Sequence, residues 1–480
     1  MSLFGKFQTA KRHPLLMAGL IFMLYSMIVS ATIQLLVLPY VLPGVHAGHG
    51  LLAGGDFPGL HEVAVRMASR ILHEGWSAWE LLPDGQSAAG LASAFYALTY
   101  PEPWSLIPIN AVLHALAGVV VMKLVHMLSN DTTIAFFSAF LGVAFPSSFQ
   151  WVSQIQKDSW YFAGMLLFLF GLVSMLRYTL RDSERSSFFF GIGLVILGAL
   201  LASMARIYAL QFIWFVGMLT AIAVIPSLVS AAVARRFSVS HSIIVFPVIL
   251  LIFIVAKSGP NDSRVAYEMP RDLAPIAGGV TAHPEPQKGR GNPPATPPNL
   301  AQSTAATIWE KSDFLPEAVD RQFFRLSTAR LGWIGQSYVS AGSMLDSEVR
   351  FSSAKQMLLY LPRAAQIGFL APFPAHWTAE GVSPGASTMR RIVGLEMIIL
   401  YPLLLIGLPI GAWRWKQRGE FWATAVFCTS FILIYSYAIP NLGTLYRMRY
   451  GFLMALAGLG FAALCLTLRD QRSPRQRRPS

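Results

Sequence analysis

The sequence predicts an all-α polytopic membrane protein, and three observations support that prediction. Hydrophobic residues make up 54% of the 480 residues, charged residues make up only 13%, and the mean hydropathy is +0.51. A soluble domain has about a quarter charged residues. The apolar residues gather in runs of about 20 residues, the length that crosses a bilayer as a helix. The Lys and Arg residues behind the net charge of +13 cluster at the ends of these runs, so we do not expect a nucleic-acid partner.

About ten of these runs qualify as transmembrane helices. They cover residues 14–40, 104–127, 131–150, 159–177, 188–205, 208–232, 240–256, 391–413, 421–439 and 450–468. The first run continues to about residue 42. This is too long for the apolar core of a secretory signal, so we expect it to remain as a span.

The basic residues predict which side of the membrane each connection faces. Clusters lie at 6–12, 177–185, 235–236, 414–418 and 469–478. With ten spans all five clusters fall on the same side, and positively charged connections face the cytoplasm. The sequence therefore predicts a multi-pass protein of the cell inner (plasma) membrane with both termini in the cytoplasm. The polar segments 43–103, 154–160, 257–390 and 440–450 then face outward.

The chain divides into three predicted parts. Residues 1–256 form an N-terminal transmembrane module whose first outer loop, 43–103, carries an amphipathic helix. In that helix Val63, Met67 and Ile71 recur every four residues, a pattern that predicts a juxtamembrane helix lying parallel to the membrane plane.

Residues 257–390 form the second part. A flexible Pro/Gly-rich loop at 259–305 is followed by a small helical extracytoplasmic subdomain. Its stretch "SSAKQMLLYLPRAAQIGFLAPFPAHW" has too short an apolar run to span a membrane, which favours an interfacial or re-entrant helix. Residues 391–480 form the C-terminal spans and a basic cytoplasmic tail.

Two outward-facing carboxylates are candidate catalytic groups. Asp56 follows two glycines at the start of the amphipathic helix, and Asp158 lies in the "QIQKDSW" turn. An extracytoplasmic carboxylate can accept the proton of an acceptor hydroxyl as a general base. A helix cap for Asp56 and an ordinary polar turn for Asp158 are the structural alternatives.

The other polar residues of the outer segments are candidates for substrate binding. Arginine and lysine side chains bind phosphate oxygens, and His61 and Glu62 lie close to Asp56 in the sequence. The candidates are His61, Glu62, Lys157, Arg206, Arg363, Arg447 and Arg449. Helix-surface positions for the first two and lipid anchoring for the arginines are the alternatives.

Four segments together resemble the GT-C superfamily of integral-membrane glycosyltransferases. They are "GGDFPGLHEVA", "GQSAAGLASAFYALTYPEPWSLIPINAVLHAL", "FPSSFQWVSQIQKDSW" and "NLGTLYRMRY", similar to segments of bacterial enzymes that build cell-surface glycans. The resemblance covers about the first 260 residues well and the C-terminal spans loosely, and it rests on the order of the segments more than on any single motif.

The resemblance implies a polyprenyl-phosphate-linked sugar donor, an extracytoplasmic glycan, lipid or protein acceptor, and Asp56 as the first-loop catalytic acid. The chain departs from the family pattern at Leu60, where many relatives have an aromatic residue. It also lacks an acidic neighbour of Asp56, so the resemblance leaves a divalent cation such as Mg²⁺ or Mn²⁺ open.

Two other functions compete with this one. A polymerase or ligase acting on polyprenyl-diphosphate-linked oligosaccharides would use the same outer arginines and depend less on Asp56. A transporter would place ionisable groups at mid-membrane in broken helices, whereas the predicted spans are nearly free of central charges. Neither Cys428 nor Cys465 has a spacing typical of metal ligands.

Overall fold

The computed structural model describes residues 13–53, 55–180, 185–234, 238–258, 309–335, 343–380 and 384–476. Its helices are α2 (Pro14–Thr32), α3 (Phe57–Glu74), α4 (Ser87–Leu98), α5 (Ile107–Ser129), α6 (Thr132–Ala144), α7 (Phe149–Val152), α8 (Asp158–Thr179), α9 (Arg185–Val233), α10 (Val239–Ser258), α11 (Glu317–Gly335), α12 (Ala354–Leu370), α13 (Pro374–Trp377), α14 (Pro384–Pro402), α15 (Leu408–Arg414), α16 (Gly419–Ala438) and α17 (Leu442–Gln476). Wider helical turns, η1 (Ile33–Val41) and η9 (Leu403–Gly407), extend α2 and α14. The predicted flexible loop at 259–305 lies outside the described residues.

The predicted fold class, a polytopic helical membrane protein, is confirmed. In the described residues, eight helical segments are long and apolar enough to cross a membrane. They are Pro14–Val41, Pro103–Ser129, Asp158–Thr179, Arg185–Arg206, Gln211–Val233, Ser387–Arg414, Gly419–Ala438 and Leu442–Arg472.

The two remaining predicted spans take other forms. Residues 131–150 form a pair of helical segments, Thr132–Ala144 and Pro146–Val152, which meet at a bend of 50° and make a ninth span if the pair crosses as one. Residues 240–256 lie in α10, whose apolar part, Val239–Leu250, is shorter than the other spans.

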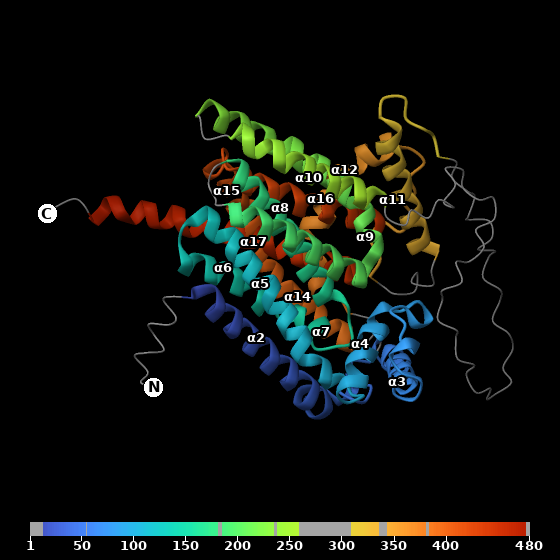
Figure 1. Cartoon of the computed structure of the whole chain (residues 1–480). Helices are drawn as coiled ribbons and strands as arrows, with labels where there is room; N and C mark the ends of the chain where they lie inside the picture. Colours follow the sequence, from blue (N-terminus) through green and yellow to red (C-terminus); the bar gives the residue numbers. More distant parts are fainter. Residues whose placement is uncertain are drawn as a thin grey trace.

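The basic clusters that the structure describes meet at one end of the bundle, which we call the basic end. Arg469 pairs with Asp131 at 2.8 Å, and Arg177 lies 3.7 Å from Glu420. Figure 1 shows the start of α2 and the end of α17 at this end, on the left, with α3, α4 and α11 at the opposite end. We call the opposite end the lobe end. The clusters at 6–12 and 235–236 lie outside the described residues.

The helices α8 and α9 pack closely because glycines line their contact. A Cβ on Gly198 would lie 2.5 Å from the carbonyl oxygen of Gly164, so the two backbones touch where any larger residue would clash. Small residues allow such close approach between membrane helices. The antiparallel packing brings Arg206, where α9 breaks (φ −151°, ψ 79°), beside Asp158 at the start of α8.

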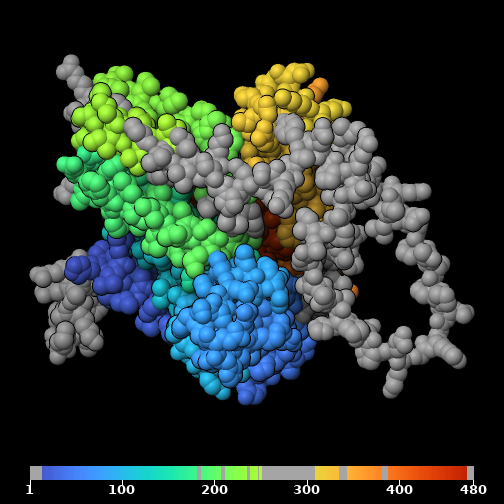
Figure 2. Space-filling view, turned by 45° about the vertical axis from the view of Figure 1, so that its right-hand side comes forward, coloured from blue at the N-terminus to red at the C-terminus, as the bar shows by residue number. Residues whose placement is uncertain are grey.

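The amphipathic helix predicted in the first outer loop is present as α3. The apolar face of α3 is covered by protein. Leu60, Ala64, Ala68 and Ile71 are at most 6% exposed, and α3 packs on α4. The two helices and their connections form the α3–α4 lobe, blue in Figure 2. α4 can cover this apolar face closely because it is itself apolar and rich in alanine.

The segment predicted to form a helical subdomain contains α11, α12 and α13, which we call the α11–α13 unit. The buried side of α12 packs on α16, and Leu359 on its opposite side is 74% exposed. The segment before α12 is joined to the start of α17, because the backbone N–H of Leu345 donates to Pro440 O at 2.9 Å and that of Leu442 to Ser343 O at 2.9 Å.

Figure 2 shows a recess between the α3–α4 lobe, the green α9–α10 region and the yellow α11–α13 unit. Residues from the red, C-terminal part of the chain are visible at its bottom. Three separate parts of the sequence thus border one hollow at the lobe end.

Candidate functional site

A buried carboxylate between two arginines lies at the lobe end. Asp158 is fully buried (0% exposed), and its Oδ1 accepts a hydrogen bond from Nη2 of Arg206 at 2.6 Å. Its Oδ2 lies 3.5 Å from Nε of Arg447, whose side chain is 26% exposed. Removing a lone carboxylate from water is costly, and two cations offset that cost. Asp158 lies at the start of α8, Arg206 at the break in α9 and Arg447 near the start of α17.

A third cation completes what we call the lobe-end cluster. Lys157 precedes Asp158, and its Nζ lies 3.1 Å from Oγ of Ser87, the first residue of α4. Ser87 in turn donates to the carbonyl oxygen of Ala205 at 3.1 Å. Burial, followed by the nearby Arg206 charge, lowers the pKa of Lys157 to about 8.

The lobe-end cluster carries an excess of positive charge. Below pH 8 three cations, Lys157, Arg206 and Arg447, face the single carboxylate of Asp158. In the part of the chain that the structure describes, the Arg447 guanidinium makes no hydrogen bond, because 3.5 Å is longer than an ordinary one. A partly exposed guanidinium with spare donors at the end of a helix bundle can bind an anion, and phosphate fits a guanidinium well.

Asp158 is poorly placed to be a general base. Its side chain is fully buried and both oxygens face arginines, whereas a base needs contact with the hydroxyl that it deprotonates. Asp158 instead lies between Arg206 and Arg447, where its charge offsets theirs.

Asp56 is exposed and stands at the N-terminus of α3. Its carboxylate makes no capping hydrogen bond to the helix, although its backbone carbonyl accepts from Leu60 N at 2.9 Å. The capping alternative thus lacks its defining contact. The next residue, Phe57, belongs to the same apolar cluster as Ala88, which follows Ser87, and Ile155, which lies two residues before Lys157. Asp56 thus adjoins, in sequence, an apolar cluster that also contains residues of α4.

His61 and Glu62 lie in different environments on α3. His61 is buried (9% exposed), and its Nδ1 lies 3.0 Å from the hydroxyl of Tyr96. Burial lowers the pKa of His61, and its ring lies 4.9 Å from that of His49. Glu62 is exposed to solvent. The structure gives His61 a position in the lobe core and leaves Glu62 on the surface.

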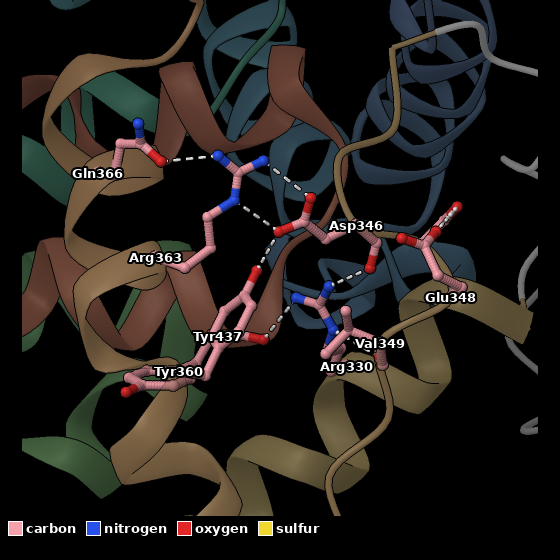
Figure 3. Close-up of polar contacts among 9 residues, drawn as sticks. Arg330, Asp346, Glu348, Val349, Tyr360, Arg363, Gln366 and Tyr437 are labelled. Atoms are coloured by element: carbon pink, nitrogen blue, oxygen red, sulfur yellow. Dashed lines mark hydrogen bonds and ion pairs between the residues drawn. The ribbon is translucent and has the colours of Figure 1, made fainter.

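Arg363 belongs to a separate network in the α11–α13 unit (Figure 3). It binds Asp346 through two hydrogen bonds of 2.9 Å and donates a third, of 2.7 Å, to Gln366. The hydroxyl of Tyr360 donates to the same carboxylate at 2.6 Å. These contacts lower the pKa of Asp346, chiefly through Arg363.

The same network holds the loop before α12 in place through hydrogen bonds. Arg330 donates to three backbone carbonyls, of Asp346, Val349 and Tyr437. Arg363 and Arg330 thus shape this unit and are not brought into the lobe-end cluster.

Arg449 is also a structural group. It is fully buried, and its guanidinium donates to the carbonyl oxygens of Ile367, Gly368 and Ala371 at the C-terminal end of α12. The last carbonyls of a helix lack most of their helical N–H partners. Ile367 O also accepts from the backbone N–H of Ala371 at 3.2 Å, and Arg449 caps this end of α12. Of the two arginines in "RMR", only Arg447 faces the cluster.

Sequence reasoning missed two residues of this region. Nothing in the sequence singled out Ser87, because small polar residues are common at helix starts. Glu396 lies within the span Ser387–Arg414 and is 3% exposed. It was detectable, because a carboxylate inside an apolar run is costly without partners.

In the described residues, no group of three or more His, Cys, Asp or Glu side chains is arranged to hold a metal ion. The structure thus offers no ready ligand set for the divalent cation that the resemblance left open at Asp56. No family model, no curated protein and no solved structure matches the chain.

Proposed function

We propose that this chain is a membrane glycosyltransferase that moves a sugar from a polyprenyl-phosphate carrier to an extracytoplasmic glycan, lipid or protein acceptor. One observation carries the proposal: two arginines lie against one buried carboxylate at the lobe end, and a third cation, Lys157, lies close by. A phosphate at a lipid boundary is the anion that suits such a place.

In the proposed reaction the acceptor hydroxyl oxygen attacks the anomeric carbon of the sugar. The bond between that carbon and the carrier phosphate oxygen breaks, and the electron pair leaves with the phosphate. Asp56 accepts the hydroxyl proton as general base, and its exposed, uncapped carboxylate suits that role.

The lobe-end cluster stabilises the leaving group in this proposal. As the bond breaks, negative charge builds on the phosphate, and fixed cations lower the energy of that state. Arg447 and Lys157 contact the phosphate, because they are the more exposed members. Arg206, which is 6% exposed, and Asp158 hold the geometry.

The proposal includes an orientation. The lobe end faces away from the cytoplasm and the basic end faces it, in the cell inner membrane. The gathering of described basic clusters at one end supports this, because positive charge is enriched on the cytoplasmic side.

The test uses the full chain in nanodiscs, supplied with lipid-linked sugars and acceptor-containing membranes from its source cells. Mass spectrometry identifies the carrier that is released. Free polyprenyl monophosphate together with a glycosylated acceptor is the expected result. Release of polyprenyl diphosphate would favour the polymerase or ligase instead. Consumption of no lipid-linked sugar would overturn the proposal.

A further inference from the structure

The bend between α6 and α7 leaves two backbone groups without helical partners inside the bundle. Pro146 has no N–H, so the carbonyl oxygen of Gly142 cannot be satisfied within the helix. The hydroxyl of Tyr450 donates to that carbonyl instead. The backbone N–H of Ser147 donates to Oε1 of Glu396 at 2.6 Å. Side chains of neighbouring helices thus satisfy the break, as they must away from water.

Glu396 has a second partner that the break does not require. Its Oε2 accepts a hydrogen bond of 2.7 Å from the hydroxyl of Tyr446. Both groups are buried, at 3% and 5% exposure. A carboxylate inside an apolar span is rare unless it is paired or functional, and satisfying one N–H would not need a charged group. The Tyr446 contact is therefore the feature that needs an explanation.

Tyr446 immediately precedes Arg447 in the first turns of α17. Polar residues in these turns contact different parts of the bundle. The Thr444 backbone N–H is capped by the side chain of Asn441 at 2.9 Å, Tyr446 contacts Glu396 of α14, and Arg447 faces Asp158 of α8. Because the Arg447–Asp158 separation of 3.5 Å is not a hydrogen bond, this contact alone does not fix the arginine.

We infer that Glu396 is a positioning residue: through Tyr446 it sets the rotation of the first turns of α17 and thereby holds Arg447 in the lobe-end cluster. The expected effect of this positioning on phosphate binding rests on the proposed function. The position of Arg447 itself can be measured without any ligand. The carboxylate ties the bent pair, α14 and α17 together at one point.

The first experiment measures binding of farnesyl phosphate to the full chain in nanodiscs. Tyr446→Phe removes only the hydroxyl and leaves the Glu396–Ser147 bond intact. We expect it to weaken binding about tenfold, the size of one hydrogen bond to a charged group. Glu396→Gln should weaken binding as well. Tyr450→Phe is the matched control, because it removes a buried hydroxyl one turn further along α17 and should leave binding unchanged.

The second experiment is independent of the ligand. Arg447→Cys is labelled with a membrane-impermeant thiol reagent, with and without Tyr446→Phe or Tyr450→Phe. The labelling rate should change about tenfold with Tyr446→Phe alone. Equal rates in all three backgrounds would overturn the inference, as would equal loss of farnesyl phosphate binding in both phenylalanine variants. If the unmodified chain fails to bind farnesyl phosphate, the proposed function loses support, while the labelling rates still decide the role of Glu396.

Discussion

Each end of the helix bundle holds a buried carboxylate between two arginines. At the lobe end Asp158, 0% exposed, contacts Arg206 at 2.6 Å and Arg447 at 3.5 Å. At the basic end Glu420, 2% exposed, contacts Arg418 at 3.0 Å and Arg177 at 3.7 Å.

The two triads differ in how their members are connected. Arg418 lies two residues from Glu420 and also donates to the carbonyl oxygen of Met127 at 3.0 Å. It fastens the start of α16 to the end of α5. The lobe-end triad is assembled from three helices, and a further cation, Lys157, lies beside it with Ser87. Both triads set two arginines against one carboxylate, and the lobe end adds a third cation, Lys157, so a buried ion pair alone does not identify a site.

The comparison first requires the two ends to lie on opposite sides of a membrane. Glu74→Cys at the end of α3 and Lys416→Cys near α16 replace exposed side chains. On intact cells an impermeant thiol reagent should label the first completely and the second only after the cells are opened. The difference should be all-or-none because a bilayer separates them. The reverse pattern would place the lobe-end cluster in the cytoplasm.

The next largest effect is expected from Asp56. Asp56→Asn keeps size and the ability to cap a helix but removes the proton acceptor, so sugar transfer should fall by about 10²–10⁴. Asp84→Asn, at another exposed carboxylate of the same lobe, is the control and should be nearly silent. Transfer in both variants close to that of the unmodified chain would return Asp56 to a structural role and direct attention to Glu62.

The fold was more predictable from the sequence than the site. Length and hydropathy located the apolar helices, because burying apolar residues in lipid depends on composition alone. The packing of α3 on α4 could not be predicted, because an apolar helix face fits a protein partner as well as a membrane. Arg447 and Arg449 could not be told apart by their spacing, because their partners, Asp158 and the end of α12, come from distant parts of the chain.

A smaller effect concerns pH. The pKa of Lys157 is lowered to about 8 from its ordinary 10.5, chiefly by burial. Anion binding should therefore weaken a few-fold as the pH rises through 8 and the amine loses its charge. Between pH 8 and 10.5 the unfolded chain binds the extra proton, so the folded state should gain stability as the pH rises. Lys157→Met should remove both dependences. If both persist in that variant, another group is responsible.

The central claim is that the lobe-end cluster binds a lipid-linked phosphate while its counterpart at the basic end only fastens helices. Farnesyl phosphate binding to nanodisc-embedded protein tests it most directly, with Arg447→Ala compared against Arg418→Ala. Removing Arg447 should weaken binding by roughly 10- to 100-fold, as loss of a hydrogen bond to a charged group predicts, and removing Arg418 should leave it unchanged. Equal affinities in the two variants would contradict the claim.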